Sequence, residues 1–280
     1  MAYTMRSFKR STRSRRPSMG RKRVGKKTTK YRSTAEKKYF DKTITGLSLE
    51  APTGATTGSG VDSGLMYVSN NWNTYSFNNQ SAPSSDTNNL LKGLITGTSA
   101  RMRVGNKIRG RELRGSTTFA AAWVASGPSN IFTQNGETAV TAVGSTPIYY
   151  LRTTYRWALV KDLQVNNTDS AVTWNQVYEN GTGSAAAGVH AELNVDNMGR
   201  FRVLSEGSFQ LNAQNPQKTL TWKLPGGHIG PVVYNGANIG ALTNHGIHFI
   251  FAAFVYGNNV ASATNLPEVV MNSRLIFSDE

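Results

Sequence analysis

The stretch YLRTTYRWALVKDL, residues 150–163, indicates most clearly how this chain folds. Its apolar and aromatic side chains recur at every second position, and polar side chains stand between them. The two sets are Leu151, Tyr155, Trp157 and Leu159 on one face and Arg152, Thr154 and Arg156 on the other. Successive side chains of a β-strand point to opposite faces, so this period of two predicts a strand with one buried face.

Similar β-rich runs lie on both sides of this stretch, and none of them has a sustained helical period. We predict further strands over residues 43–49, 65–68, 106–124, 200–211, 219–224, 231–234, 245–256 and 268–277. One short helix is predicted over 87–95, where Asn88 and Asn89 could cap the leucine-rich run that follows. The chain is therefore expected to be all-β.

Long connections rich in Gly, Ser, Thr and Asn separate these strands, notably residues 125–145 and 166–188. Loops of this length are uncommon unless they are functional or exposed. Strands with such excursions favour an eight-stranded single jelly roll, which is a sandwich of two antiparallel sheets. An immunoglobulin-like sandwich is the main alternative, but the chain has no cysteine pair and its loops are too long for that fold.

The charge of the chain is concentrated in its first 42 residues. They hold 16 of the 31 Lys and Arg residues and only two acids, a net charge of +14 out of +15. Residues 1–35 also have few large apolar groups, so we expect a basic arm that is disordered when free. The predicted domains are this arm, residues 1–42, and a nearly neutral body, residues 43–280.

Dense positive charge of this kind neutralises phosphates and releases counterions, which gives strong binding to nucleic acid without regard to its sequence. The same clusters could also serve as a nuclear import signal. A merely solvated tail is the alternative, but it would leave this charge unbalanced. The arm residues predicted to bind nucleic acid are Arg6, Lys9, Arg10, Arg13, Arg15, Arg16, Arg21, Lys22, Arg23, Lys26, Lys27, Lys30 and Arg32.

A second basic cluster lies inside the body, within residues 100–114. A strand from residue 106 would project Lys107, Arg109 and Arg111 to one face, where they could meet nucleic acid together with Arg101 and Arg103. The alternative is an ordinary exposed face whose cations pair with acids of a neighbouring strand. Glu112 is the only acid within reach in the sequence.

Nothing in the sequence indicates catalysis or a cofactor. Cysteine is absent, no Ser lies in a nucleophile elbow, and no pair of carboxylates has a spacing that suggests acid–base chemistry. His245 and His248 form an HxxH pair, but in a strand this spacing points the two rings to opposite faces, so no metal site is expected. The longest apolar run, 247–256, has about half of the ~20 residues that a membrane-spanning helix needs, and no secretory signal is expected at the N-terminus.

Several landmarks, in order along the chain, resemble a known family. These are the basic arm with EKKYFD (36–41), GTSARMRVGNKI (97–108), YRWALVKD (155–162), NMGRFRVL (197–204), VYNG (233–236) and SRLIFSD (273–279). The chain resembles the single jelly-roll capsid proteins of small circular Rep-encoding single-stranded DNA (CRESS-DNA) viruses, which are related to coat proteins of the satellite tobacco necrosis virus type. Lys161 departs from the pattern, because an apolar or aromatic residue is expected before Asp162.

The resemblance implies an eight-stranded jelly roll, a closed icosahedral shell of sixty copies (T=1), and an inward-facing arm that condenses a single-stranded DNA genome, with RNA not excluded. A virion location is expected with it. The basic clusters of the arm would bind a host import receptor, with assembly in the host nucleus, and the short apolar runs predict no membrane partner. A cellular nucleic-acid-binding protein with a basic tail is the chief alternative. A jelly-roll lectin or cupin-like enzyme is a third possibility, but it would need a ligand or metal cluster that the sequence does not offer.

Overall fold

The computed structural model describes residues 36–50, 64–76, 84–85, 88–125, 139–140, 148–165, 171–179, 187–236, 241–256 and 267–280. This part of the chain is mostly β and forms two antiparallel sheets, one large and one of three short strands. The all-β expectation is therefore confirmed. No helix of the described residues is long and apolar enough to cross a membrane.

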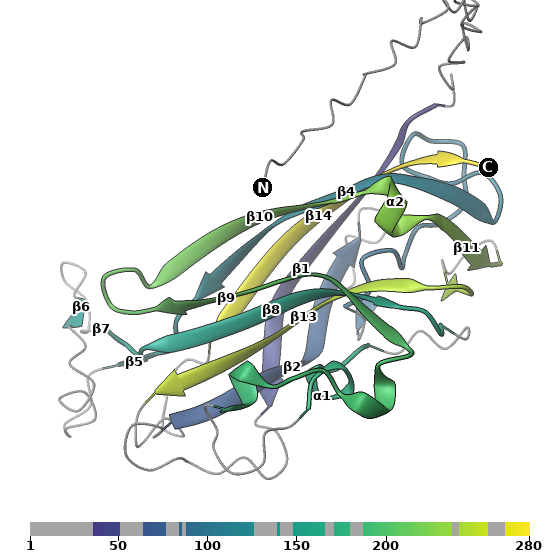
Figure 1. The fold of residues 1–280 in the computed structure, drawn as a ribbon. Coiled ribbons are helices and arrows are strands. Elements are labelled where there is room, and N and C mark those ends of the chain that lie inside the picture. The colour runs from purple at the N-terminus through teal and green to yellow at the C-terminus, as the bar shows by residue number, and fades with distance from the viewer. Residues whose placement is uncertain are drawn as a thin grey trace, which may run out of the picture. The chain divides into compact units, whose positions relative to one another are not determined.

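Strands follow one another with few helical interruptions (Figure 1). They are β1 (Lys38–Glu50), β2 (Gly64–Ser76), β3 (Ser84–Ser85), β4 (Lys107–Ala120), β5 (Trp123–Ala125), β6 (Ala139–Val140), β7 (Ile148–Tyr150), β8 (Thr153–Asp162), β9 (Phe201–Leu211), β10 (Gln217–Pro225), β11 (Pro231–Asn235), β12 (Ala241–Leu242), β13 (Gly246–Tyr256) and β14 (Glu268–Asp279). The helical turns are α1 (Trp174–Val177), η2 (Ala187–His190), η3 (Val195–Asn197) and α2 (Gly226–Ile229).

The long strands pair in a nested pattern. Of the strands described, eight have nine residues or more: β1, β2, β4, β8, β9, β10, β13 and β14. The first pairs with the last (β1 with β14), the second with the seventh (β2 with β13), the third with the sixth (β4 with β10) and the fourth with the fifth (β8 with β9), all antiparallel. Across the sheet their order is β10-β4-β14-β1-β2-β13-β8-β9.

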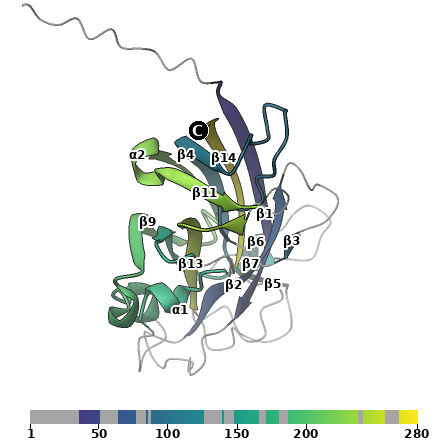
Figure 2. The same cartoon turned by 90° about the vertical axis from the view of Figure 1, so that its right-hand side faces the viewer.

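The two halves of this sheet face each other across the main hydrophobic core. In Figure 1 the half with β10, β4 and β14 lies above the half with β8, β13 and β2, and Figure 2 shows the same layers from the side. Phe119 of β4 reaches across, with its ring 5.1 Å from that of Tyr155 on β8 and 6.3 Å from that of Phe249 on β13. Such interdigitation of aromatic rings stabilises the sandwich beyond the area that it buries.

All nine predicted strand ranges fall on strands of the structure, several of which are longer than predicted. The helix predicted over 87–95 is wrong, because residues 90–93 form a turn instead. The Asn89 side chain accepts a hydrogen bond from the Leu91 backbone N–H (3.0 Å), and the Asn88 amide donates to the carbonyls of Val172 (2.7 Å) and Phe249 (3.1 Å). The two Asn side chains thus tie the turn to its neighbours, and no helix begins after them.

β8 was expected to have one buried face, but both of its faces are buried. A second apolar cluster covers the face opposite the main core, and it includes part of the predicted loop 166–188. Trp174 and Tyr178, stacked with their rings 4.3 Å apart, pack with Val172, Val177 and Val189 against the sheet. Residues 171–179 and 187–191 therefore form a cover over β8 and β13, and residues 166–170 and 180–186 lie outside the described part. Most of the other long loop, 126–138 and 141–147, also lies outside it.

Candidate nucleic-acid interface

The body begins earlier than predicted. β1 starts at Lys38, so the predicted boundary after residue 42 falls inside this strand. Lys38 and Lys42 are both buried: Lys38 pairs with Asp279 (Nζ to Oδ2, 2.8 Å), and Lys42 donates to the carbonyl of Asn89. These two cations belong to the body. The thirteen arm residues predicted to bind nucleic acid, Arg6 to Arg32, lie outside the described residues, and residues 1–35 carry a net charge of +13.

Lys107, Arg109 and Arg111 lie along the outer face of β4, as predicted. All three are exposed, whereas Ile108 and Gly110 between them are buried. The pairing of β4 with β14 shifts by one residue here, because Gly110 faces Phe277 and Glu112 faces Ile276. Arg111 is thus the extra residue of a β-bulge, which keeps it on the exposed side despite the change of register.

An acid from the far end of the chain partly neutralises this row. Glu280 forms an ion pair with Lys107 (2.7 Å), and the Arg111 Nε donates to the Ser278 hydroxyl (3.2 Å). The hydrogen bond from Lys107, helped by the charges of Arg109 and Arg111, holds the pKa of Glu280 below its ordinary value. The alternative of cations paired with a neighbouring strand is therefore realised in part, and the row retains an excess of positive charge.

Arg103 does not belong to this surface. Its side chain is fully buried and donates to the carbonyls of Leu94 (3.0 Å), Gly105 and Gly236 (2.6 Å) and to Asn106 Oδ1 (3.0 Å). Its guanidinium also lies 4.6 Å from the centre of the Tyr234 ring. A side chain held in this way cannot turn to a phosphate, so its predicted role in binding nucleic acid is wrong. Arg101, two residues earlier, is exposed.

The register of the strands places the start of the body beside the basic row. Lys38 of β1 faces Phe277 of β14, and Phe277 faces Gly110 of β4. The described chain begins two residues before β1, at Glu36, so its first residues lie at the end of the sheet that carries Lys107 and Arg109. The residue at which the body begins therefore lies at the same end of the β10-β4-β14-β1 half as the basic row.

Three further cations, missed in the sequence, lie on this outer face. Arg114 of β4 is flanked directly by Lys223 of β10 and Arg274 of β14. The alternation of each strand could have shown which side chains share a face, but it contains no information on which strands are neighbours. The acids opposite them are Glu112, 2.8 Å from the Lys223 Nζ, and Asp41, which pairs with the Arg274 fork at 2.6 and 2.8 Å.

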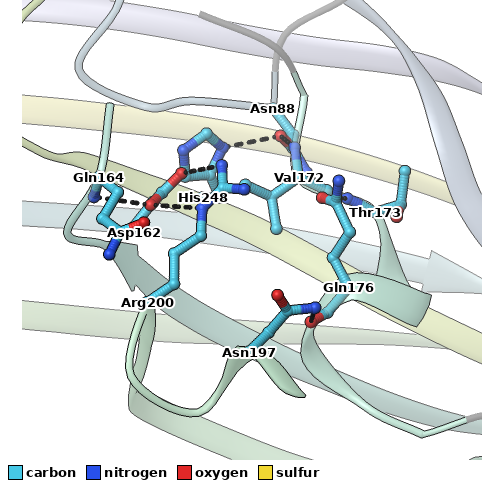
Figure 3. A network of polar contacts seen from close by, with 9 residues as sticks. All are labelled: Asn88, Asp162, Gln164, Val172, Thr173, Gln176, Asn197, Arg200 and His248. Atoms are coloured by element: carbon cyan, nitrogen blue, oxygen red, sulfur yellow. Dashed lines mark hydrogen bonds and ion pairs between the residues drawn. The ribbon is translucent and has the colours of Figure 1, made fainter. Parts of the chain in front are cut away.

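His245 and His248 belong to the interior. His248 is fully buried and shares a hydrogen bond with Asn88 (Nδ1 to Oδ1, 2.9 Å), next to an ion pair in which the Arg200 fork binds Asp162 at 3.0 and 2.8 Å (Figure 3). Burial lowers the pKa of His248 to about 3 and that of His245 to about 4. The described residues contain no group of three or more His, Asp or Glu side chains that could hold a metal ion.

The same network stabilises the ionised form of the Asp162 carboxylate. Burial alone would raise the pKa of this group, but the hydrogen bonds from Arg200 and from the Gln164 backbone, with the Arg200 charge, keep it below its ordinary value. Nearby, the Asn197 amide donates to the Gln176 carbonyl (3.1 Å), which joins the turn before β9 to α1 (Figure 3). The network therefore anchors the cover, residues 171–179 and 187–191, to the sheet.

Comparison of this chain with models of known protein families and with curated protein sequences finds no match.

Proposed function

We propose that this chain is a viral coat protein. Copies of it assemble into a small icosahedral shell, and the basic arm packages a single-stranded DNA genome by neutralising phosphates, without catalysis. The observation that carries the proposal is the +13 charge of residues 1–35, attached at one end of a nearly neutral β body beside an exposed basic row. This division suits a protein whose body forms the capsid shell and whose arm binds a polyanion.

The fold proposed for the body is an eight-stranded jelly roll. Nested pairing of the first strand with the last, and so on inward, is what results when one long antiparallel hairpin is wound into two facing layers. Both layers then contain strands from the two halves of the chain. This agrees with the resemblance to capsid proteins of CRESS-DNA viruses in the landmarks quoted above.

Assembly multiplies the charge of the arm. In a shell of the sixty copies that the resemblance implies, 60 × 13, or about 780, positive charges would stand against one negative charge per nucleotide. Contacts between these charges and phosphates do not depend on base sequence. RNA could therefore replace DNA as cargo in the absence of the viral genome. The same basic clusters would engage a nuclear import receptor, which places assembly in the host nucleus and the finished product in the virion.

The mass and contents of the purified particles test this proposal. Light scattering should report about 1.8 MDa, which is 60 × 30.5 kDa, and nucleic acid should co-purify with the particles. Deletion of residues 1–35 should leave the body folded but remove most of the packaged nucleic acid, because β1 and its partners remain whole. A stable 30.5 kDa monomer at high concentration in several buffers would favour a cellular nucleic-acid-binding protein instead.

A further inference from the structure

A hollow of about 680 Å³ lies on the outer face of the sheet formed by β10, β4, β14 and β1. Four cations, two acids, small or polar residues and one Trp line it: Asp41, Lys42, Thr43, Glu112, Arg114, Gly115, Thr221, Trp222, Lys223, Asn272, Ser273 and Arg274. This volume is within the range of about 300 to 1,000 Å³ that is typical of small-molecule sites. The hollow can therefore take a group as large as a nucleotide.

The charges around the hollow are unequally paired. Arg274 has a carboxylate of its own, Asp41, which it binds with both arms of its fork. Arg114 and Lys223 share a single acid, Glu112, at 3.8 Å and 2.8 Å. A separation of 3.8 Å is too long for a hydrogen bond, so the Arg114 guanidinium is held in the hollow by charge alone. Both side chains are more than half exposed, at 53% for Arg114 and 63% for Lys223.

Arg114 and Lys223 together are suited to bind a phosphate, because the one carboxylate near them, Glu112, cannot satisfy both cations. The planar Arg fork can give two parallel hydrogen bonds to phosphate oxygens, and Lys adds a compact positive charge. Asn272 lies in the same hollow, and its Oδ1 accepts from the Thr43 hydroxyl (2.6 Å), so the Nδ2 group is the donor it can offer to a base. These contacts do not select one base sequence.

We propose that this hollow binds one phosphodiester, with its nucleoside, of the packaged single strand, and that Glu112 is the partner of Arg114 and Lys223 until the phosphate displaces it. The inference rests on the proposed function and adds a defined contact on the body to the arm. Arg114 lies seven residues along β4 from Lys107, a distance of about 23 Å in an extended strand. The row of Lys107, Arg109 and Arg111 thus extends along β4 toward the hollow.

Photo-crosslinking of the full chain to an oligodeoxynucleotide that carries 5-iodouracil tests this site. Crosslinked peptides should come from β4 and β10, whose outward-facing side chains line the hollow, as well as from the arm. Replacement of both Arg114 and Lys223 by Ala should lower the yield at the hollow by about threefold or more and leave the yield at the arm unchanged. The control Arg202→Ala, which removes an exposed cation from β9, should change neither yield.

Glu112→Gln gives the sharper test, because it should raise the yield at the hollow by freeing both cations, and a misfolded protein would not show a gain. An unchanged yield in this variant overturns the proposed competition. Crosslinks confined to the arm, in particles that still assemble and package, overturn the site but leave the proposed function standing. A chain that crosslinks nowhere overturns both.

Discussion

Arg103, which was predicted to bind nucleic acid because of its charge, instead stabilises the fold. Its guanidinium joins the carbonyl of Leu94, before the loop that precedes β4, to that of Gly236, after β11. The bond to the Leu94 carbonyl is buried and the bond to the Gly236 carbonyl is partly buried, so the charge of Arg103 is spread over several acceptors and the Tyr234 ring. Arg103 thus adds to the other hydrogen bonds that connect this loop to the sheet, such as those from the Tyr39 N–H to the Ala100 carbonyl (3.0 Å) and from the Val104 N–H to Asp279 Oδ1 (2.9 Å).

Arg103→Ala should lower the free energy of unfolding by about 1–3 kcal/mol, because the buried Leu94 carbonyl and three partly buried acceptors lose their donor. Arg103→Lys should recover only part of this, since an ammonium group cannot imitate the fork. Urea denaturation of the unassembled chain gives both values. Arg109→Ala, which removes an exposed cation from the adjacent strand, should change stability by no more than about 0.5 kcal/mol. Equal losses in the two Ala variants would contradict this role for Arg103.

The two buried His residues should make the body sensitive to mild acid. Their pKa values, about 3 for His248 and about 4 for His245, lie below the unfolded value of 6.5, so below pH 6.5 the unfolded chain takes up protons that the folded chain refuses. Stability is complete above pH 6.5 and is lost as the pH falls toward 4. Between pH 7 and 5 the loss should be about 2 kcal/mol for each His.

His248→Gln tests this directly, because urea unfolding at the two pH values should then show about half of the loss found in the parent chain. The charges that face His248 are Asp162, Lys42, Arg200 and Lys92, and Lys161 faces His245. Among these, Asp162 begins to take up protons only below its ordinary range, so it does not contribute between pH 7 and 5. The same loss in both chains would exclude His248 as a source.

Lys161 departs from the pattern of the resembled family for a reason visible in the structure. Its Nζ donates to the carbonyls of His228 (3.0 Å) and Ile229 (3.1 Å), the last two residues of α2. The C-terminal carbonyls of a helical turn have no partner within the turn, and a cation satisfies them. A single side chain thus links β8 in one layer to the end of the connection between β10 and β11 in the other.

At the scale of elements, the cover of residues 171–179 and 187–191 buries most of the second face of β8 and β13. Arg156 lies at the boundary of this cover: it donates to the Ala191 carbonyl (2.6 Å), pairs with Glu206 (3.1 Å) and stands 4.3 Å from the Tyr178 ring centre. Its aliphatic stem is buried while its charged end makes these contacts, which is why the sequence pattern of this face looked exposed.

Trp174→Ala should destabilise the body by about 3–5 kcal/mol and increase the binding of a hydrophobic dye, because it removes the largest side chain of this cover. Met198→Ala, a change of an exposed apolar residue in the same region, should stay within about 0.5 kcal/mol of the parent. Denaturant midpoints and dye fluorescence together measure the effect. If the Trp174 variant were as stable as the parent, the cover would not contribute to the folded core.

Most strands were predictable because their alternation is local information, available at each residue from its two neighbours. Two kinds of feature were not predictable. The cover over β8 depends on a connection whose polar composition hides Trp174, Val177 and Tyr178 among loop residues. The neighbours of the basic row depend on register: Glu280 reaches Lys107 only because β14 lies beside β4. Pairing between strands far apart in the sequence decides both the ion pairs and the hollow.

At the scale of the whole molecule, the arm should act through its number of charges. Replacement of Arg13, Arg15 and Arg16 by Gln removes three of the 13 charges of residues 1–35, so the packaged nucleic acid should fall by about a quarter. The same three positions changed to Lys should package as much as the parent. The ratio of absorbance at 260 and 280 nm of purified particles measures the content. A loss in the Lys variant equal to that in the Gln variant would indicate recognition of Arg itself.

The pairing of β1 with β14 also sets the order of events during synthesis. Lys38 meets Phe277, so β1 emerges from the ribosome with more than 230 residues still to be made before its partner exists. At about 5–20 residues per second this takes roughly 12 to 48 seconds. During that time one edge of β1 has no strand to pair with, and the charged residues Lys38, Asp41 and Lys42 make it a poor template for aggregation. Closure of the body is thus a late and slow step, which follows from topology of high contact order.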